Sequence, residues 1–222
     1  MHNAAEKKKA SSAKQPAARS GKTAKKASPT RRGQPSGAID QLKVTLCDFR
    51  PPIWRRLLVP GDFTLGDLHW VLQIAFGWTN SHMHQFVTKD RTYYSDPTFQ
   101  LGDGPFGMSV HDETRTRLDG VLKQPKDKLT YDYDFGDSWE HELVVEKLLD
   151  RDPAATYPRC VAGKQAGPPE DVGGVWGYAE LLDILADETH PEREERLEWV
   201  GEDFDPAAFD QDAVNRELAR LR

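Results

Sequence analysis

The sequence has few cysteines and no long hydrophobic run. Its two cysteines, Cys47 and Cys160, lie far apart in a chain of 222 residues, which is not the pattern of a disulfide-stapled secreted domain. No stretch approaches the roughly eighteen consecutive apolar residues that a transmembrane helix needs. The N-terminus is basic but lacks the apolar segment of a secretory signal, and its Lys-rich, Pro- and Gly-broken composition disfavours a mitochondrial transit peptide. We therefore expect a cytoplasmic protein that does not enter a membrane.

The familiar catalytic signatures are also missing. The sequence contains no P-loop, no G-x-S-x-G, no H-E-x-x-H and no dinucleotide-binding fingerprint, and so the enzyme classes that those motifs report are disfavoured. We expect no cofactor, and a non-enzymatic role is favoured over an enzymatic one. A divalent metal ion is the one inorganic ligand that the residue types leave open.

The sequence does contain two regions of opposite charge. Residues 1–37 carry ten basic side chains and one acid, a net charge of +9, whereas residues 38–222 carry 20 basic and 35 acidic side chains, a net charge of −15. Ala, Ser, Pro and Gly separate the charges of the first region, which shows no apolar periodicity to offset its ordering entropy. We predict a disordered basic tail, 1–37, followed by one folded acidic domain, 38–222.

Such a tail can neutralise phosphates and bind nucleic acid in a salt-sensitive way, without sequence preference. The side chains expected to make contact are Lys7, Lys8, Lys9, Lys22, Lys25, Lys26, Arg31 and Arg32. Two other interpretations stay open, namely a solubilising extension and a flexible arm that rests on the acidic domain itself. The net acidity of the domain argues against a broad DNA-binding face there.

Hydrophobic periodicity predicts that the domain is α+β. Strands are predicted at 42–46 and 53–59, as an N-terminal hairpin, and at 83–88 and 91–95, with a loop-rich stretch over 97–107. Thr64 and Asp67 form a capping box for a helix that Gly77 ends. Further helices are predicted at 178–186 and 191–200, and from Asp205 to the C-terminus.

The strongest β signal is a central hairpin of 129–135 and 139–147. A three-residue loop, 136–138, would place Phe135 opposite Trp139 and Tyr133 opposite His141, with all four on the apolar face.

The other face of this hairpin is acidic. Asp132 and Asp134 would lie across from Glu142 and Glu140, and like charges across a ladder repel. We expect these carboxylates to be solvated, or offset by a basic partner such as the tail, or by a divalent ion.

Six sequence blocks carry a resemblance to a known family. They are Pro51-Pro52-Ile53-Trp54-Arg55-Arg56, Thr64-Leu65-Gly66-Asp67-Leu68-His69, the run from Phe76 to Phe86 (FGWTNSHMHQF), the run from Tyr133 to Glu142 (YDFGDSWEHE), Pro168-Pro169-Glu170-Asp171-Val172-Gly173-Gly174, and Phe204-Asp205-Pro206. Over about 39–218 the chain resembles the plasmid pRiA4b ORF-3-like family, whose members are often labelled TnpR-family passenger proteins of insertion elements. The resemblance implies an α+β roll, with helices packed on a mixed β-sheet, and a link to mobile elements, but no activity.

One departure from the family bears on metal binding. Many relatives have several cysteines in the segment corresponding to 160–174, whereas this sequence keeps Cys160 and has Gly167 and Val172 at the other two places. A thiolate zinc site takes about four ligands, so a cysteine cluster is not expected here.

His82 and His84 are the candidate metal ligands. In an extended strand their side chains point to the same face, as two ligands of one ion would, and Asp137 and Glu140 would complete the set if the fold brings them near. The competing interpretation is structural, with both histidines hydrogen-bonded beside aromatic side chains.

Aromatic and basic side chains suggest a pocket. The candidates are Trp54, Arg55, Trp78, Trp139, His141 and Trp176. Arg55 beside Trp54 could grip a phosphate or stack on a base, and His141 could act as a general base. Structural alternatives are a core histidine, and arginines paired with the acidic hairpin face. Two functions thus stand side by side: a binding module with a protein or nucleic-acid partner, and a metal-assisted hydrolase or nuclease.

Overall fold

The structure is a computed structural model that describes residues 37–99 and 109–221, so the residues of the basic tail before Gly37 and most of the loop at 97–107 lie outside it. The strands are β1 (Ile39–Leu46), β2 (Trp54–Pro60), β3 (His84–Thr88), β4 (Tyr93–Ser95), β5 (Val110–Asp112), β6 (Lys128–Tyr133), β7 (Trp139–Leu149) and β8 (Arg159–Lys164). The helices are α1 (Leu65–Phe76), α2 (Leu118–Val121), α3 (Gly174–Ala186), α4 (Arg193–Val200) and α5 (Gln211–Leu218), with 3-10 turns at Pro97–Phe99 and Glu113–Arg115.

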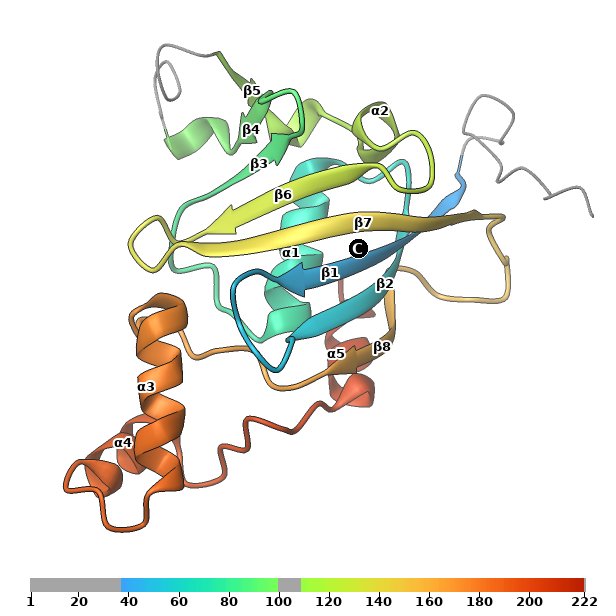
Figure 1. Cartoon of the computed structure of the whole chain (residues 1–222). Coiled ribbons are helices and arrows are strands. Elements are labelled where there is room, and N and C mark those ends of the chain that lie inside the picture. The colour runs from blue at the N-terminus through green and yellow to red at the C-terminus, as the bar shows by residue number, and fades with distance from the viewer. Residues whose placement is uncertain (1–36, 100–108, 222) are drawn as a thin grey trace, which may run out of the picture.

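The strands form one eight-stranded sheet in the order β5-β4-β3-β6-β7-β1-β2-β8 (Figure 1). All neighbouring strands are antiparallel except β4 and β5, which are parallel. The predicted α+β class with a mixed sheet is therefore confirmed. Among the described residues, no helix combines the length and the apolarity needed to cross a bilayer.

The core lies between α1 and one face of the sheet. Leu42, Val44 and Leu46 of β1 are buried there, and α1 runs behind β6, β7 and β1 in Figure 1. The capping box that starts α1 is present, because the Thr64 side chain accepts from the backbone N–H of Asp67 and the Asp67 side chain accepts from that of Thr64. Gly77 ends the helix with a φ of 83°, a left-handed value that suits glycine.

The central hairpin has a different register from the predicted one. Tyr133, not Phe135, lies opposite Trp139, and Phe135 is 40% exposed in the connecting loop. The strand stops at Tyr133 because Asp134 turns into the left-handed region, at φ 57°, where its Oδ1 accepts from the backbone N–H of Gly136 at 2.9 Å. The shift of two residues keeps the side chains that remain paired in β6 and β7 on their predicted faces.

The acidic face of the hairpin is offset mainly by side chains of the same sheet. Arg56 donates to Glu146 at 2.6 Å and Lys128 pairs with Glu142. Asp132 lies opposite Glu140 and accepts from the Gln85 amide on β3, while Asp134 lies outside the ladder. The predicted pairings of Asp134 with Glu140 and of Asp132 with Glu142 are therefore both wrong.

The C-terminal helices begin at other places than predicted. α3 starts at Gly174, earlier than expected, α4 starts two positions after Pro191, and Asp205 begins a turn rather than a helix. The last helix, α5, starts after Asp210, whose side chain accepts from the backbone N–H of Ala213. In Figure 1, α3 and α4 lie beyond the end of the sheet nearest the β6–β7 loop, and α5 lies beside β8.

Candidate metal centre

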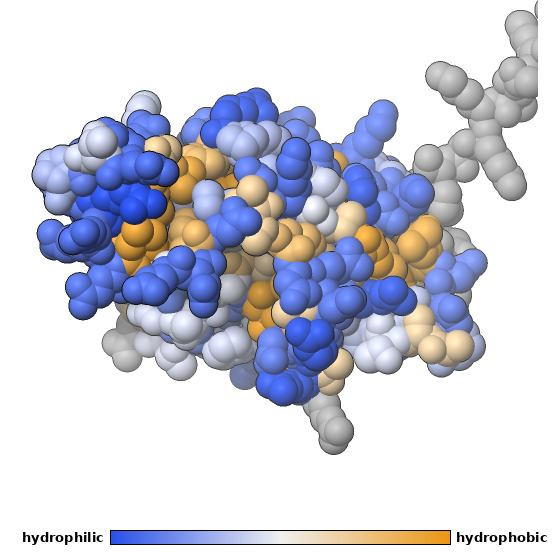
Figure 2. All heavy atoms as spheres, turned by 90° about the horizontal axis from the view of Figure 1, so that it is seen from below, coloured by the Kyte–Doolittle hydropathy of each residue, from blue (hydrophilic) through white to orange (hydrophobic). Residues whose placement is uncertain are grey.

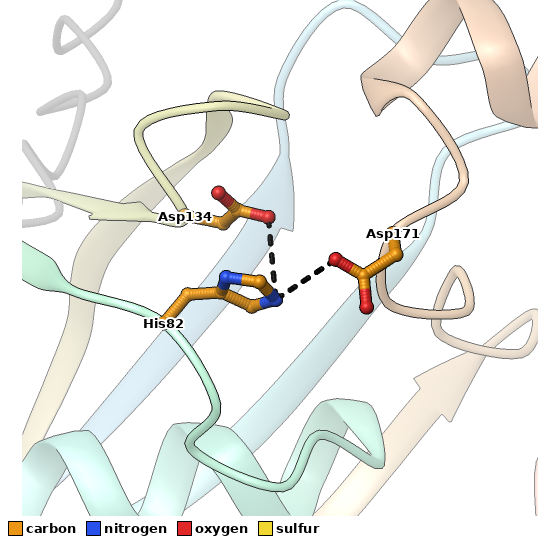
Figure 3. Close-up of side chains that lie close together, drawn as sticks. All are labelled: His82, Asp134 and Asp171. Atoms are coloured by element: carbon orange, nitrogen blue, oxygen red, sulfur yellow. Dashed lines mark ion pairs between the residues drawn. The ribbon is translucent and has the colours of Figure 1, made fainter.

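Three segments distant in the sequence meet at the end of the sheet where α3 begins. His82 lies just before β3, Asp134 just after β6, and Asp171 in the loop that leads to α3 (Figure 3). His82 Nε2 is 3.2 Å from Asp171 Oδ1 and 3.6 Å from Asp134 Oδ2. Each residue offers one ligand atom, and the three atoms lie within 4.8 Å of one another.

The spacing of His82 Nε2 from the two carboxylates is compatible with a shared ion. His82 Nε2 is buried, yet it makes no hydrogen bond of acceptable geometry with either carboxylate. Two ligand atoms that are each about 2.1 Å from a tetrahedral metal lie about 3.4 Å apart, and the two distances from Nε2 bracket this value. Among the described residues, no other group of three His, Cys, Asp or Glu side chains comes together in this way.

The two carboxylates differ in their surroundings. Asp134 is buried and its Oδ1 is engaged by Gly136, so Oδ2 is the oxygen that faces His82. The side chain of Asp171, in contrast, is 72% exposed. An ion held by the trio would therefore have protein on one side and solvent on the other, which leaves room for water or a substrate.

Glu170 forms a second polar group beside the trio. Its carboxylate accepts from the hydroxyls of Thr79 and Tyr133. Burial alone would raise the pKa of Glu170, but these hydrogen bonds outweigh burial and lower the pKa below its ordinary value. Burial, together with the hydrogen bond to Glu170, raises the pKa of Tyr133. Glu170 therefore stays ionised and Tyr133 stays protonated at neutral pH.

The loop that carries Asp171 is held by close backbone contacts. A Cβ atom at Gly174 would lie 2.4 Å from the carbonyl oxygen of Asp137, and one at Gly167 would lie 1.9 Å from that of Phe76. Asp137 Oδ2 also accepts from the backbone N–H of Gly173 at 3.0 Å. The glycines thus let this loop dock against the β6–β7 loop and the end of α1, which places Asp171 beside Asp134.

Comparison with known proteins identifies the family. The model of the plasmid pRiA4b ORF-3-like protein family matches residues 38–213. The chain belongs to this family. The pRiA4b ORF-3-like chain is 39% identical over 188 residues to the uncharacterized protein y4hQ of Sinorhizobium fredii. The aligned region covers 83% of this chain and 92% of that protein.

A solved structure has a similar fold. The crystal structure of MM3350, a protein of unknown function from Methanosarcina mazei Go1, is similar with a TM-score of 0.71 and 35% identity. The similarity covers 80% of this chain and 96% of that one. Three of the six sequence blocks that resemble the pRiA4b ORF-3-like family, 76–86, 133–142 and 168–174, meet at the candidate metal centre.

The structure does not gather the four metal ligands that the sequence suggests. His82 joins the trio, but His84 is buried on the core side, where its Nε2 lies 2.9 Å from Glu113 and its ring stacks on His69 at 3.5 Å. Asp137 caps the Gly173 backbone, and Glu140 is exposed on the opposite face of the sheet. His82 lies before β3 rather than in it, so the same-face argument for an extended pair does not apply.

The residues expected to form a pocket lie in several different environments. Trp78, Trp139 and His141 are buried together in the aromatic core of this family member, and Trp176 is 85% exposed. Trp54 lies on the solvent side of the sheet, with Lys43 and Arg56 over its ring.

Arg55 points to the other side of its strand and is buried. Its side chain bonds to three backbone carbonyls, including Ala75 O at 2.7 Å. The structural alternative is therefore favoured for His141, whereas the pairing of Arg55 with the acidic hairpin face is wrong, because its guanidinium bonds to backbone carbonyls in the core. Of the two arginines beside Trp54, it is Arg56 that pairs with the acidic hairpin face.

Sequence reasoning did not join Asp134 or Asp171 to His82: it considered a divalent ion at Asp134 only as part of the acidic hairpin face, and it did not consider Asp171 as a ligand. Both lie in blocks quoted for the family resemblance, which was a usable signal. Asp134 was placed in the strand, where its side chain would have pointed to the face opposite the core. Asp171 entered the sequence analysis only as part of the block 168–174.

Proposed function

We propose that this protein binds a divalent cation through His82, Asp134 and Asp171 and uses it in a hydrolytic reaction. The observation that supports this function best is the convergence of one imidazole nitrogen and two carboxylate oxygens from three separate segments. One histidine and two carboxylates form a mixed nitrogen and oxygen set that suits Zn²⁺ or Mn²⁺. Three protein ligands with an exposed side are typical of catalytic rather than structural zinc sites.

The neighbouring side chains fit hydrolysis. A divalent cation at the trio would lower the pKa of a bound water and polarise the bond under attack. Glu170 is ionised and precedes the proposed ligand Asp171 in the chain, so it is the candidate acceptor of the proton that the attacking water loses. Tyr133 and Thr79 hold the Glu170 carboxylate in place.

We expect the full chain to be stabilised by Zn²⁺ or Mn²⁺. At a free metal concentration a hundred times the Kd, the gain in the free energy of unfolding is about 2.7 kcal/mol. Loss of an outer-shell partner weakens metal binding roughly 10–100-fold. His82→Gln and Asp171→Asn each remove a direct ligand, so each should weaken metal binding by more than that. Isothermal calorimetry on metal-stripped protein measures the affinity, and thermal unfolding with and without metal measures the stabilisation.

Glu140→Gln is the matched control for these variants. It also removes one carboxylate, but Glu140 is exposed on the face of the sheet away from the trio. Its metal affinity should equal that of the natural chain. Equal losses in Glu140→Gln and Asp171→Asn, or no metal binding by the natural chain, would contradict the proposed centre.

The charge of residues 1–37 supports a second candidate function, an accessory module that contacts nucleic acid, for example in the processes of mobile elements. A segment with a net charge of +9 can neutralise several phosphates at once. The acidic remainder of the chain would then bind a protein partner. The compartment that this role implies is the cytoplasm.

We expect only the chain with residues 1–37 to bind nucleic acid. If six to ten phosphates are contacted, the affinity for duplex DNA should fall by about 10³–10⁵ between about 50 and 200 mM salt. Fluorescence anisotropy with DNA and RNA of mixed sequence, on the full chain and on a chain that starts at Ala38, measures this. Binding by the shortened chain with the same salt dependence would show that the tail is not the contact.

A further inference from the structure

Four lysines line a broad groove at the end of β6 away from the candidate metal centre. They are Lys89, Lys123, Lys126 and Lys128, and all four are exposed. The groove lies between the turn of the β3–β4 hairpin and the segment that leads from α2 into β6 (Figure 1), and its volume is about 970 Å³. Because β6 runs from Lys128 to the residue before Asp134, the groove and the metal centre lie at opposite ends of this strand.

The lysines of the acidic region are concentrated at this groove. Residues 38–222 contain seven lysines and carry a net charge of −15, and four of the seven lysines line the groove. Among the described residues that line it, none is an arginine. A groove with an excess of lysines thus lies on a part of the chain that is otherwise strongly acidic.

The acids of the groove are engaged within the protein. They are Asp90, Asp127 and Glu142. Asp90 accepts from two threonine hydroxyls of its own turn, Asp127 accepts from two backbone N–H groups of the segment before β6, and Glu142 pairs with Lys128. The lysines of the groove that form no ion pair with a described residue are Lys89, Lys123 and Lys126. Three ammonium groups are therefore left for a ligand.

The strand register brings like charges together at the groove. Thr88 lies opposite Leu129 in the β3–β6 ladder, so the next positions outward are Lys89 on one strand and Lys128 on the other. Like charges on adjacent strands repel each other, and Glu142 pairs with only one of these two lysines. An anion bound in the groove would offset this repulsion.

Lys126 has an unusual backbone conformation at the groove. Its φ is 77°, in the left-handed region that residues other than glycine seldom occupy. The backbone N–H of Lys126 donates to the carbonyl oxygen of Val145 at 2.7 Å, and the N–H of Val145 donates to that of Asp127 at 3.0 Å. These contacts with β7 hold the turn that carries Lys126. A glycine would adopt this conformation at a lower cost, and residues in costly conformations cluster at functional sites.

The chemistry and size of the groove favour several phosphate groups. The planar guanidinium of an arginine matches a carboxylate, whereas a lysine ammonium is a compact charge that suits a tetrahedral phosphate. Pockets for small ligands have volumes of roughly 300–1,000 Å³, and the groove lies near the upper end of this range. Its lysines come from two separate segments of the chain, so a chain of phosphates would contact more of them than a single ion.

The large exposed apolar side chains lie elsewhere on the molecule. Among the described residues they are Trp70, Met83, Phe135, Trp176 and Trp199, and none of them lines the groove. Figure 2, which views the molecule from below, shows apolar surface between polar side chains on that face. The groove therefore lacks the apolar anchors that are typical of protein–protein interfaces, and a charged small molecule suits it better than a protein surface.

From these observations we infer that the groove binds a small molecule that carries a chain of phosphate groups, such as inorganic triphosphate or a nucleoside triphosphate. The ammonium groups of Lys89, Lys123 and Lys126 contact the phosphate oxygens. The site is separate from the candidate metal centre and does not depend on a metal ion.

The test uses the full chain in metal-free buffer with inorganic triphosphate, ATP and inorganic phosphate. Isothermal calorimetry measures the Kd, and a rise in the midpoint of thermal unfolding shows that a ligand prefers the folded chain. We expect triphosphate and ATP to bind and to raise the midpoint. The single phosphate should bind at least about tenfold more weakly, because it contacts fewer of the lysines. The affinity for triphosphate should fall as salt screens the exposed charges.

Lys89→Gln/Lys123→Gln and Lys147→Gln/Lys164→Gln form a matched pair of double variants. Each removes two exposed lysines and retains residues 1–37, but only the first pair of lysines lines the groove. The first double variant should weaken triphosphate binding about tenfold, and the second should weaken it less than about twofold. His82→Gln should bind triphosphate as the natural chain does.

The outcomes separate this inference from the proposed function. Absence of triphosphate binding by the natural chain, or equal affinities in the two double variants, overturns the groove as a phosphate site. A loss of triphosphate binding in His82→Gln also overturns it, because the ligand would then lie at the metal centre.

The identity of the ligand is tested by the same set of compounds. Equal affinities for single phosphate and triphosphate overturn the chain of phosphates as the ligand. A preference for ATP or for triphosphate supports the inference and identifies a nucleotide or an inorganic chain as the source of the phosphates. If single-stranded DNA bound more weakly to Lys89→Gln/Lys123→Gln than to the control double variant, the groove would contact nucleic acid, and the small-molecule class would be overturned.

Discussion

Arg55→Ala is expected to lower the free energy of unfolding by about 3–5 kcal/mol. Arg55 is 2% exposed, and its guanidinium donates to the carbonyl oxygens of Ala75, Trp54 and Lys164 at 2.7, 2.9 and 3.0 Å. Its charged group also lies 4.1 Å from the ring centroid of Phe209. Truncation leaves a cavity and removes the donor from three carbonyls at once. Urea unfolding, with the slope compared between variants, measures the loss.

Arg56→Ala is the matched control, because it removes the same side chain from the next position of β2. Arg56 lies on the solvent side of the sheet and pairs with Glu146 at side-chain exposures of 32% and 23%. Such a pair contributes less than about 1 kcal/mol. Arg55→Lys should fall between the two, because an ammonium cannot reproduce the planar set of donors. Equal losses in Arg55→Ala and Arg56→Ala would contradict this account.

Arg55 also connects the core to the candidate metal centre. It binds Ala75 O in the last turn of α1, and the chain that leaves this turn leads directly to His82. Trp78, in the same segment, donates from its Nε1 to the carbonyl of Pro168 at 2.9 Å, next to the loop that carries Asp171. Loosening of the α1 end in Arg55→Lys should therefore weaken metal binding as well as stability.

The elements that the sequence predicts well are those with local signals. The capping box of Thr64 and Asp67 and the glycine at 77 define α1 from neighbouring residues alone. The face of each strand follows from alternation, which survives the two-residue change of register in the central hairpin. The change itself depends on Asp134 adopting a left-handed conformation, which an aspartate tolerates but does not require.

The candidate centre could be predicted only in part, because two of its three ligands lie in loops. Sequence spacing placed His82 beside His84, whereas the fold pairs His84 with Glu113, 29 positions away. The approach of Asp171 depends on the packing of Gly174 against Asp137, a contact between segments that no local pattern reports. Residue types thus suggest a metal site, but only the tertiary arrangement shows which residues are its ligands.

Lowering the pH from 7 to 5 is expected to reduce the free energy of unfolding by about 4 kcal/mol. Burial lowers the pKa of His69 and of His141 from 6.5 to about 3, so both are neutral in the fold. In the unfolded chain they gain protons below about pH 6.5. The unfolded state then binds more protons than the folded state, and stability falls with pH through this window. Each histidine accounts for about 2 kcal/mol at pH 5.

His141→Phe should remove about half of this pH dependence. His141 is fully buried between Phe76 and Trp78, and its Nε2 has no hydrogen-bond partner, so a phenyl ring suits the site. The change in stability between pH 7 and 5 should fall to about 2 kcal/mol, whatever the stability at pH 7. Urea unfolding at pH 5, 6 and 7 on both proteins measures it. Carboxylates titrate mostly below this window, since their unperturbed pKa values are about 4. If the dependence of stability on pH were unchanged in His141→Phe, His141 would be protonated inside the fold.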